Sequence, residues 1–148
     1  MIKLLEIIKV NKPVPNNIKQ LEQIQSQIKS SNNLKEKQEL ALKAAEFVLP
    51  IWNYYYPNDK RPQVAIEASK LYLANPTEEN KVKLKDAYTA AYAAAAATSA
   101  AAYAAYAAYY VAYAVYAAVY VDADVCASTA AAAAAAAIKA TKIHFKII

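Results

Sequence analysis

Residues 100–121 read AAAYAAYAAYYVAYAVYAAVYV, a stretch built only from alanine, tyrosine and valine. Alanine has the highest intrinsic helix propensity and is poor in strands, so the stretch predicts a long helix. Its tyrosines recur at spacings of three and four, which places them on one broad face of that helix. We expect the rings on this face to be core, buried against alanine-rich helices: Tyr106, Tyr109, Tyr113, Tyr116 and Tyr120.

Glycine is absent from the 148 residues, and alanine supplies roughly a quarter of them. P-loops, dinucleotide-binding fingerprints and nucleophile elbows each need backbone that only glycine permits, so these sites are excluded. Glycine-dependent hairpins are missing too, which disfavours a β-rich fold. With 58% hydrophobic residues, the chain has enough apolar material for a core. We therefore predict an all-α fold, a bundle of five or six helices with a central Ala/Tyr-rich helix.

The chain is expected to form a single helical domain over residues 1–148, with three compositional parts. Residues 1–33 form N-terminal extension helices, residues 34–86 form mixed helices, and residues 87–142 form the Ala/Tyr-rich helical core. Besides the helix that the opening stretch predicts, apolar spacing and turn signals predict helices over 2–10, 17–30, 34–49, 62–74, 77–97 and 126–142.

Single residues mark the predicted helix ends. Pro50 should end or kink its helix, because proline disfavours helical backbone in the residue before it. Pro62 stands where a proline opens a helix, and Thr77 is the cap of the helix that follows. Asp122 and Asp124 are expected either at a helix junction or near a helix start.

The formal net charge is +5, and Arg61 is the only arginine. The lysines are scattered rather than clustered, so we do not expect nucleic-acid binding. Residues 100–121 are long enough to span a bilayer, but tyrosine prefers membrane interfaces to the bilayer centre. A buried helix is therefore favoured over a membrane hairpin. The single cysteine, Cys126, cannot form an internal disulfide.

The sequence offers no convincing catalytic or metal-binding set. His144 is the only histidine and lies far in sequence from Cys126, so no metal-ligand spacing exists. These two residues are the one formal nucleophile–base pair. The C-terminal tail is expected to be too peripheral to deliver the histidine. We therefore predict that the chain is not an enzyme and has no catalytic residue, no metal and no cofactor.

The segment with the strongest binding signature runs from Tyr54 to Arg61. It combines three consecutive tyrosines with the only arginine, and both residue types are enriched at interface hot spots. The candidate binding residues are Tyr54, Tyr55, Tyr56, Asp59, Lys60 and Arg61. The competing interpretation is a structural turn held by an Asp–Arg pair. A tyrosine-lined groove on the Ala/Tyr-rich helix is a further alternative, binding a partner or a small ligand stacked on the rings.

Residues 45–73, AEFVLPIWNYYYPNDKRPQVAIEASKLYL, resemble a segment of a family of bacterial immunity proteins, the Imm-five-like group. The family pattern is a VLP-(L/I)-aromatic stretch, then P-x-D-x-R-P, then a helix that starts near AIEA. The matching residues are Val48, Leu49, Pro50, Pro57, Asp59, Arg61, Pro62, Ala65, Ile66, Glu67 and Ala68. Residues 136–140, AAIKA, are similar to a run in the family's Ala-rich helices, so the resemblance covers roughly residues 38–140. The family's second half carries His and Gly where this chain has YVDADVCASTAA.

The resemblance implies an all-α cytoplasmic protein, made next to a toxin, that neutralises the toxin by binding it. We therefore expect a non-catalytic, immunity-like binding protein whose partner is a toxin or effector protein. No nucleic acid and no membrane are expected as partners, and self-association into a homo-oligomer is left open. The alternative is a phage-encoded anti-defence protein that sequesters a small nucleotide, or a virion-associated structural or cargo protein.

Overall fold

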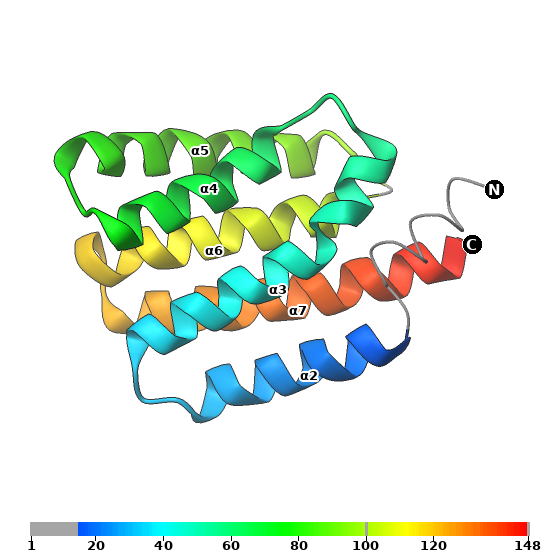
Figure 1. Cartoon of the computed structure of the whole chain (residues 1–148), viewed down its shortest axis with the longest axis horizontal. Helices are drawn as coiled ribbons and strands as arrows, with labels where there is room; N and C mark the ends of the chain where they lie inside the picture. Colours follow the sequence, from blue (N-terminus) through cyan, green and yellow to red (C-terminus); the bar gives the residue numbers. More distant parts are fainter. Residues whose placement is uncertain (1–14, 100, 148) are drawn as a thin grey trace.

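The computed structural model describes residues 15–99 and 101–147, which contain six helices and no strand (Figure 1). The helices are α2 Pro15–Ser30, α3 Leu34–Tyr55, α4 Arg61–Ala74, α5 Glu78–Ala96, α6 Ala102–Tyr120 and α7 Ala123–Ile147. The all-α bundle that the composition predicts is confirmed. The predicted helix over 2–10 lies outside the described residues.

The Ala/Tyr-rich helix α6 is central, as the sequence predicts. It packs against α3, α4, α5 and α7, whereas α2 packs only against α3 and α7 among the described helices. Figure 1 shows the helices lying side by side with their axes broadly aligned, and with α2 and α5 at opposite edges. The described helices share one hydrophobic core.

Side-chain caps, rather than glycines, begin three of these helices. Asn33 Oδ1 accepts a hydrogen bond from the backbone N–H three residues later, at 3.1 Å, where α3 starts. Thr77 Oγ1 does the same at 3.1 Å at the start of α5, and Asp122 Oδ1 at 2.8 Å at the start of α7. Each cap satisfies a backbone donor that the first helical turn leaves free. A chain without glycine can therefore still change direction over two or three residues.

The two prolines that mark predicted helix ends behave differently. Pro50 does not end α3, which continues through it to Tyr55. A proline inside a helix removes one backbone hydrogen bond. Ile51 and Trp52 in the next turn are fully buried, and this packing keeps the turn helical. Pro62 lies in the first turn of α4, where its missing N–H removes no hydrogen bond, as the sequence predicts.

α7 is longer than predicted, because it includes the C-terminal tail instead of ending near residue 142. Thr141 and His144 in its last turns are buried, at 2% and 0% exposed. Among the described residues, Ala123–Lys146 is the one helical stretch that is long and apolar enough to cross a membrane. Buried helices of water-soluble bundles satisfy the same criterion, and α7 packs against α2, α3 and α6.

The centre of the bundle is lined with alanine. The buried residues of α6 are only alanine and valine. The α7 helix contributes Ala130, Ala133, Ala134 and Ala137, all of them 0% exposed. Such small side chains let neighbouring helix backbones approach closely, and close-packed interiors tolerate little added volume. A larger side chain in this region must therefore push helices apart.

The tyrosines of α6 lie at the margin of the core rather than inside it, which corrects the expectation of burial drawn from their spacing. The six tyrosines between residues 103 and 116 are half-buried, and Tyr120 is 37% exposed. They occupy the side of α6 that faces away from the buried alanines, because an aromatic ring does not fit between closely spaced backbones. Truncating one of them should therefore cost less than the ~3–5 kcal/mol typical of a core aromatic.

Overpacking should disrupt the alanine-lined centre. Ala112→Leu and Ala117→Leu should each lower the free energy of unfolding by about 1–3 kcal/mol, because both alanines are fully buried. Ala93→Leu is the matched control on the exposed side of α5, where the change should stay within about 0.5 kcal/mol. Urea denaturation followed by circular dichroism measures all three. Equal effects at the buried and exposed sites would contradict this description of the core.

Candidate functional site

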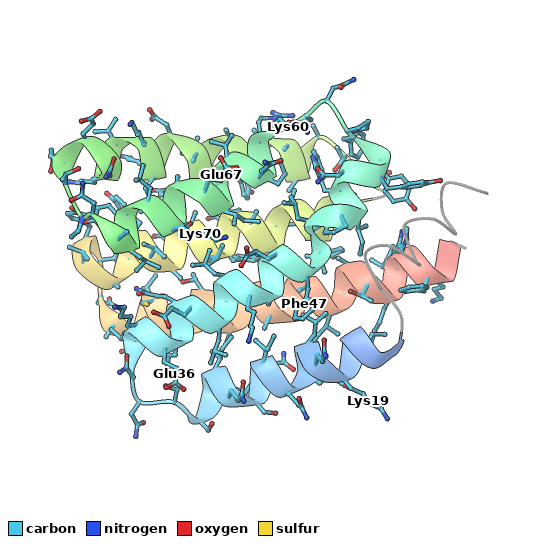
Figure 2. The ribbon with its side chains drawn as sticks, viewed as in Figure 1. Lys19, Glu36, Phe47, Lys60, Glu67 and Lys70 are labelled. Atoms are coloured by element: carbon cyan, nitrogen blue, oxygen red, sulfur yellow. The ribbon has the colours of Figure 1, made fainter. Side chains whose placement is uncertain are left out.

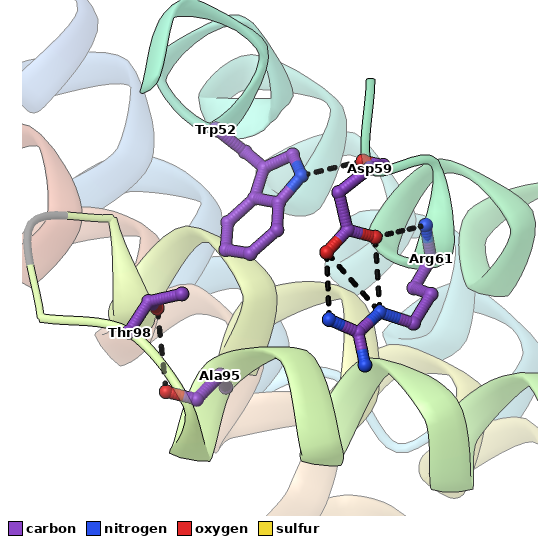
Figure 3. A network of polar contacts seen from close by, with 5 residues as sticks. All are labelled: Trp52, Asp59, Arg61, Ala95 and Thr98. Atoms are coloured by element: carbon purple, nitrogen blue, oxygen red, sulfur yellow. Dashed lines mark hydrogen bonds and ion pairs between the residues drawn. The ribbon is translucent and has the colours of Figure 1, made fainter. Parts of the chain in front are cut away.

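The two residues predicted to pair are in contact in the loop between α3 and α4. Arg61 Nε and Nη2 donate to the Asp59 carboxylate at 2.9 and 2.7 Å, and the Arg61 backbone N–H donates to Asp59 Oδ1 at 3.1 Å (Figure 3). The Trp52 indole N–H donates to the Asp59 backbone carbonyl at 2.7 Å. The hydrogen bonds from Arg61 lower the pKa of Asp59 below its ordinary value. The predicted Asp–Arg pairing is therefore confirmed.

The three tyrosines at residues 54–56 are half-buried rather than displayed. The ring centroid of Tyr56 lies 4.6 Å from that of Trp52. The other two rings lie beside the His144 imidazole, at centroid distances of 6.2 and 5.8 Å. Of the six predicted binding residues, only the two cationic ones, Lys60 and Arg61, are exposed. A partner-binding role for this segment stays a prediction.

His144 is fully buried, so the expectation that the tail is too peripheral to place it is wrong. Its Nδ1 lies 3.3 Å from the Tyr55 hydroxyl oxygen, and the Phe145 ring is also adjacent. Its Nε2 is buried without a hydrogen-bond partner. Burial lowers the pKa of His144 below the ordinary value of 6.5, so the imidazole is neutral at neutral pH.

Cys126 and His144 do not form a nucleophile–base pair. Both lie on α7, 18 residues apart, which corresponds to about 27 Å along the helix axis. Cys126 is buried, with Gln38 Nε2 at 3.6 Å from its sulfur, and burial raises the pKa of the thiol. Within the described ranges, no group of three or more His, Cys, Asp or Glu residues is placed to hold a metal ion.

The most distinctive surface lies on α5 and α6 and is covered by tyrosine rings. The α6 helix carries no charged residue, and between residues 103 and 116 every residue that is not buried is a tyrosine. Two tyrosines of α5 pack against these rings, with centroids 5.1–6.0 Å apart. We name this surface the tyrosine face, and its members are Tyr88, Tyr92, Tyr103, Tyr106, Tyr109, Tyr110, Tyr113, Tyr116 and Tyr120.

A lysine sits at each end of the tyrosine face. The Lys139 ammonium of α7 lies 4.7 Å from the Tyr103 ring centroid, and the Lys81 ammonium of α5 lies 4.0 Å from that of Tyr120. Both contacts are cation–π interactions. Tyr103 and Tyr120 are 17 residues apart on α6, or about 26 Å. The face therefore has an uncharged aromatic centre and a lysine at each end, and Lys81 also lies 3.7 Å from the Glu78 carboxylate on its own helix.

Two hydroxyls of the tyrosine face, those of Tyr88 and Tyr109, have raised pKa values. Burial, and then the neighbouring tyrosines, raise the pKa of Tyr88 and Tyr109 above the ordinary value of 10.0. At one end of the face, the Tyr120 hydroxyl is hydrogen-bonded to that of Tyr72 at 2.7 Å, and burial raises the pKa of Tyr72 to about 12. The hydroxyls of Tyr72, Tyr88 and Tyr109 are therefore neutral at physiological pH.

The sequence shows that these tyrosines share one side of the helix, but the depth of burial predicted for that side was too great. The signal that locates them is the absence of charge on α6, because tyrosine is then the only side chain with a polar group to place toward water. The contact with Tyr88 and Tyr92 joins two helices, so spacing within one helix does not reveal it.

Comparison with known proteins adds no assignment. No protein-family model matches the chain, and no curated protein and no solved structure matches it either. The resemblance of residues 45–73 to immunity proteins therefore depends on the sequence motif alone.

The Asp59–Arg61 pair should contribute little to stability, because the two side chains are 26% and 43% exposed. Arg61→Ala should lower the free energy of unfolding by about 0–1 kcal/mol, not by the ~1.5–3 kcal/mol of a buried charge-assisted hydrogen bond. Trp52→Phe, which removes a fully buried indole, should cost more. Thermal denaturation followed by circular dichroism compares the two variants. A larger loss with Arg61→Ala would show that the pair holds the loop.

The burial of His144 should make stability depend on pH. Its pKa in the folded protein is lower than in the unfolded chain, so the unfolded chain binds more protons between the two values. The stability that the neutral imidazole contributes is therefore fully present above the unfolded-chain pKa of 6.5. It is lost as the pH falls toward the lower pKa of the folded protein. His144→Gln should remove this slope between about pH 7 and pH 5, measured by urea denaturation. If the variant keeps the same dependence of unfolding free energy on pH, that dependence comes from other titratable groups.

Proposed function

We propose that this chain is a non-catalytic binding protein and that the tyrosine face docks a protein partner. One observation carries the proposal: the outward surface of an uncharged helix presents tyrosine and nothing else between residues 103 and 116. Tyrosine offers a large amphipathic contact area for little loss of side-chain entropy. It is also enriched at the residues that dominate binding energy in protein interfaces.

Packing within the bundle accounts for only part of these rings. Tyr92 and Tyr120 are the two exposed rings of the face, at 49% and 37%, and its other rings are half-buried. A contiguous aromatic surface of this kind on a folded chain is a common mark of an interaction site. The half-buried rings are already ordered by their neighbours, so a partner would bind a surface that needs little rearrangement.

The charges around the tyrosine face favour a particular kind of partner. Lys139 at one end favours a contact surface that is apolar at its centre and acidic at that edge. Lys81 at the other end is paired with Glu78, an exposed contact of small energy that a partner carboxylate could replace. The formal net charge of +5 acts in the same direction, because it attracts an acidic partner from a distance. An acidic protein is therefore the partner chemistry that we propose.

A toxin or effector protein is the partner class that the resemblance of residues 45–73 suggests. In that role, the cytoplasmic chain would neutralise its partner by covering part of the partner's surface. Capture of a small nucleotide and a virion role stay predictions from the sequence, because no feature of the described residues favours them over a protein partner.

Co-purification from the source cells tests the proposal. Tyr92→Lys should reduce recovery of the main co-purifying protein at least about tenfold, because it places a charge in the aromatic centre of the interface. Val82→Lys is the matched control, since Val82 is 53% exposed on the same helix but lies outside the tyrosine face. Equal losses with both variants, or no loss with Tyr92→Lys, would contradict the proposal.

The toxin version has its own readout. If the partner is a toxin, producing it alone should stop growth, and the wild-type chain should restore growth while Tyr92→Lys should not. A partner that binds the tyrosine face but has no effect on growth would retain the binding proposal and reject neutralisation.

A further inference from the structure

A groove runs between α4 and α5, on the side of α5 opposite to the tyrosine face. Its volume is about 440 Å³. Val64, Ala68 and Leu71 line it from α4, and Ala87 and Ala90 line it from α5. Figure 1 shows these two helices side by side, and Figure 2 shows Glu67 on the part of α4 that faces α5. Each helix contributes residues at spacings of three and four, so the groove follows one stripe along each helix.

The two walls of the groove have complementary shapes. Val64 and Leu71 are large apolar side chains that remain 47% and 42% exposed on α4. The facing stripe of α5 presents alanines, with Ala87 only 5% exposed, which leaves the hollow beside them. The patch therefore contains both protruding apolar groups and a space of side-chain size.

The charges around the groove are also of both signs. Glu67, Asp86 and Lys83 line it, so the patch holds two carboxylates and one ammonium group. Lys83 lies 3.5 Å from Glu79 on its own helix, a solvent-exposed pair of small energy. Forming a new ion pair at this groove would therefore disrupt little.

We infer that the groove between α4 and α5 is the interface of a two-fold homodimer, in which Val64 and Leu71 of one copy enter the groove of the other. In a two-fold dimer the same patch faces itself, so it must hold both halves of every contact. This patch does: it combines apolar protrusions with an alanine-lined hollow, and Lys83 with two carboxylates. The α4 and α5 helices of both copies would then form a four-helix layer.

The inferred interface is independent of the proposed function. Asp86 and Tyr88 are two positions apart on α5, which separates their directions by about 200° around the helix. One flank of α5 therefore lies in the dimer groove and the other in the tyrosine face. A dimer would carry two tyrosine faces, both open to partners.

Analytical ultracentrifugation of the purified full-length chain, over roughly 5–500 µM, tests the inference. Wild type should show a concentration-dependent monomer–dimer equilibrium. Leu71→Glu should be monomeric throughout, because it replaces an exposed apolar contact by a third carboxylate, and circular dichroism verifies that it folds. A wild-type chain that is monomeric over the whole range would overturn the inference.

A charge exchange separates this interface from any other. Lys83→Glu should weaken dimerisation at least about tenfold, and the double variant Lys83→Glu with Asp86→Lys should restore it, because the patch again holds both signs. Tyr92→Lys should leave dimerisation unchanged. Loss of the dimer with Tyr92→Lys but not with Leu71→Glu would overturn the inference, because the tyrosine face would then be the dimer interface.

Discussion

The close approach of α6 to its neighbours through alanine is the constraint on which the other features of this bundle depend. Buried alanine removes little apolar area from water, at ~0.8 kcal/mol for each buried carbon group, so no single side chain dominates the stability of the centre. The centre is instead stabilised by many short contacts between backbones and methyl groups acting together. The same narrow spacing excludes rings, and the tyrosines of α6 therefore cover its outer side.

Features that depend on neighbouring residues could be predicted from the sequence. The absence of glycine and the abundance of alanine predict the all-α class. The caps Asn33 and Thr77 are local patterns, and so is the pairing of Asp59 with Arg61 two positions later. Each of these contacts joins residues that are close in sequence, so the local sequence is enough to predict it.

Features that join distant segments could not be predicted. Spacings of three and four show that the tyrosines share a face, but they do not show which face turns inward. The contact between Tyr55 and His144 joins residues 89 positions apart, and without it the C-terminal tail looks peripheral. The tyrosine face and the groove between α4 and α5 each need two helices, so neither exists in a single stretch of sequence.

The alanine-lined centre also determines which kinds of mutation this chain can suffer. In most cores, random substitution more often makes a side chain smaller, and neighbours relax partly into the space it leaves. At Ala105, Ala108 or Ala133 only glycine is smaller, so almost every single substitution adds atoms where none can be received. The loss of stability then arises from steric overlap rather than from a cavity. A larger side chain on one helix would need a smaller one opposite it on the neighbouring helix. Alanine can be replaced there only by glycine, so such compensation is almost impossible.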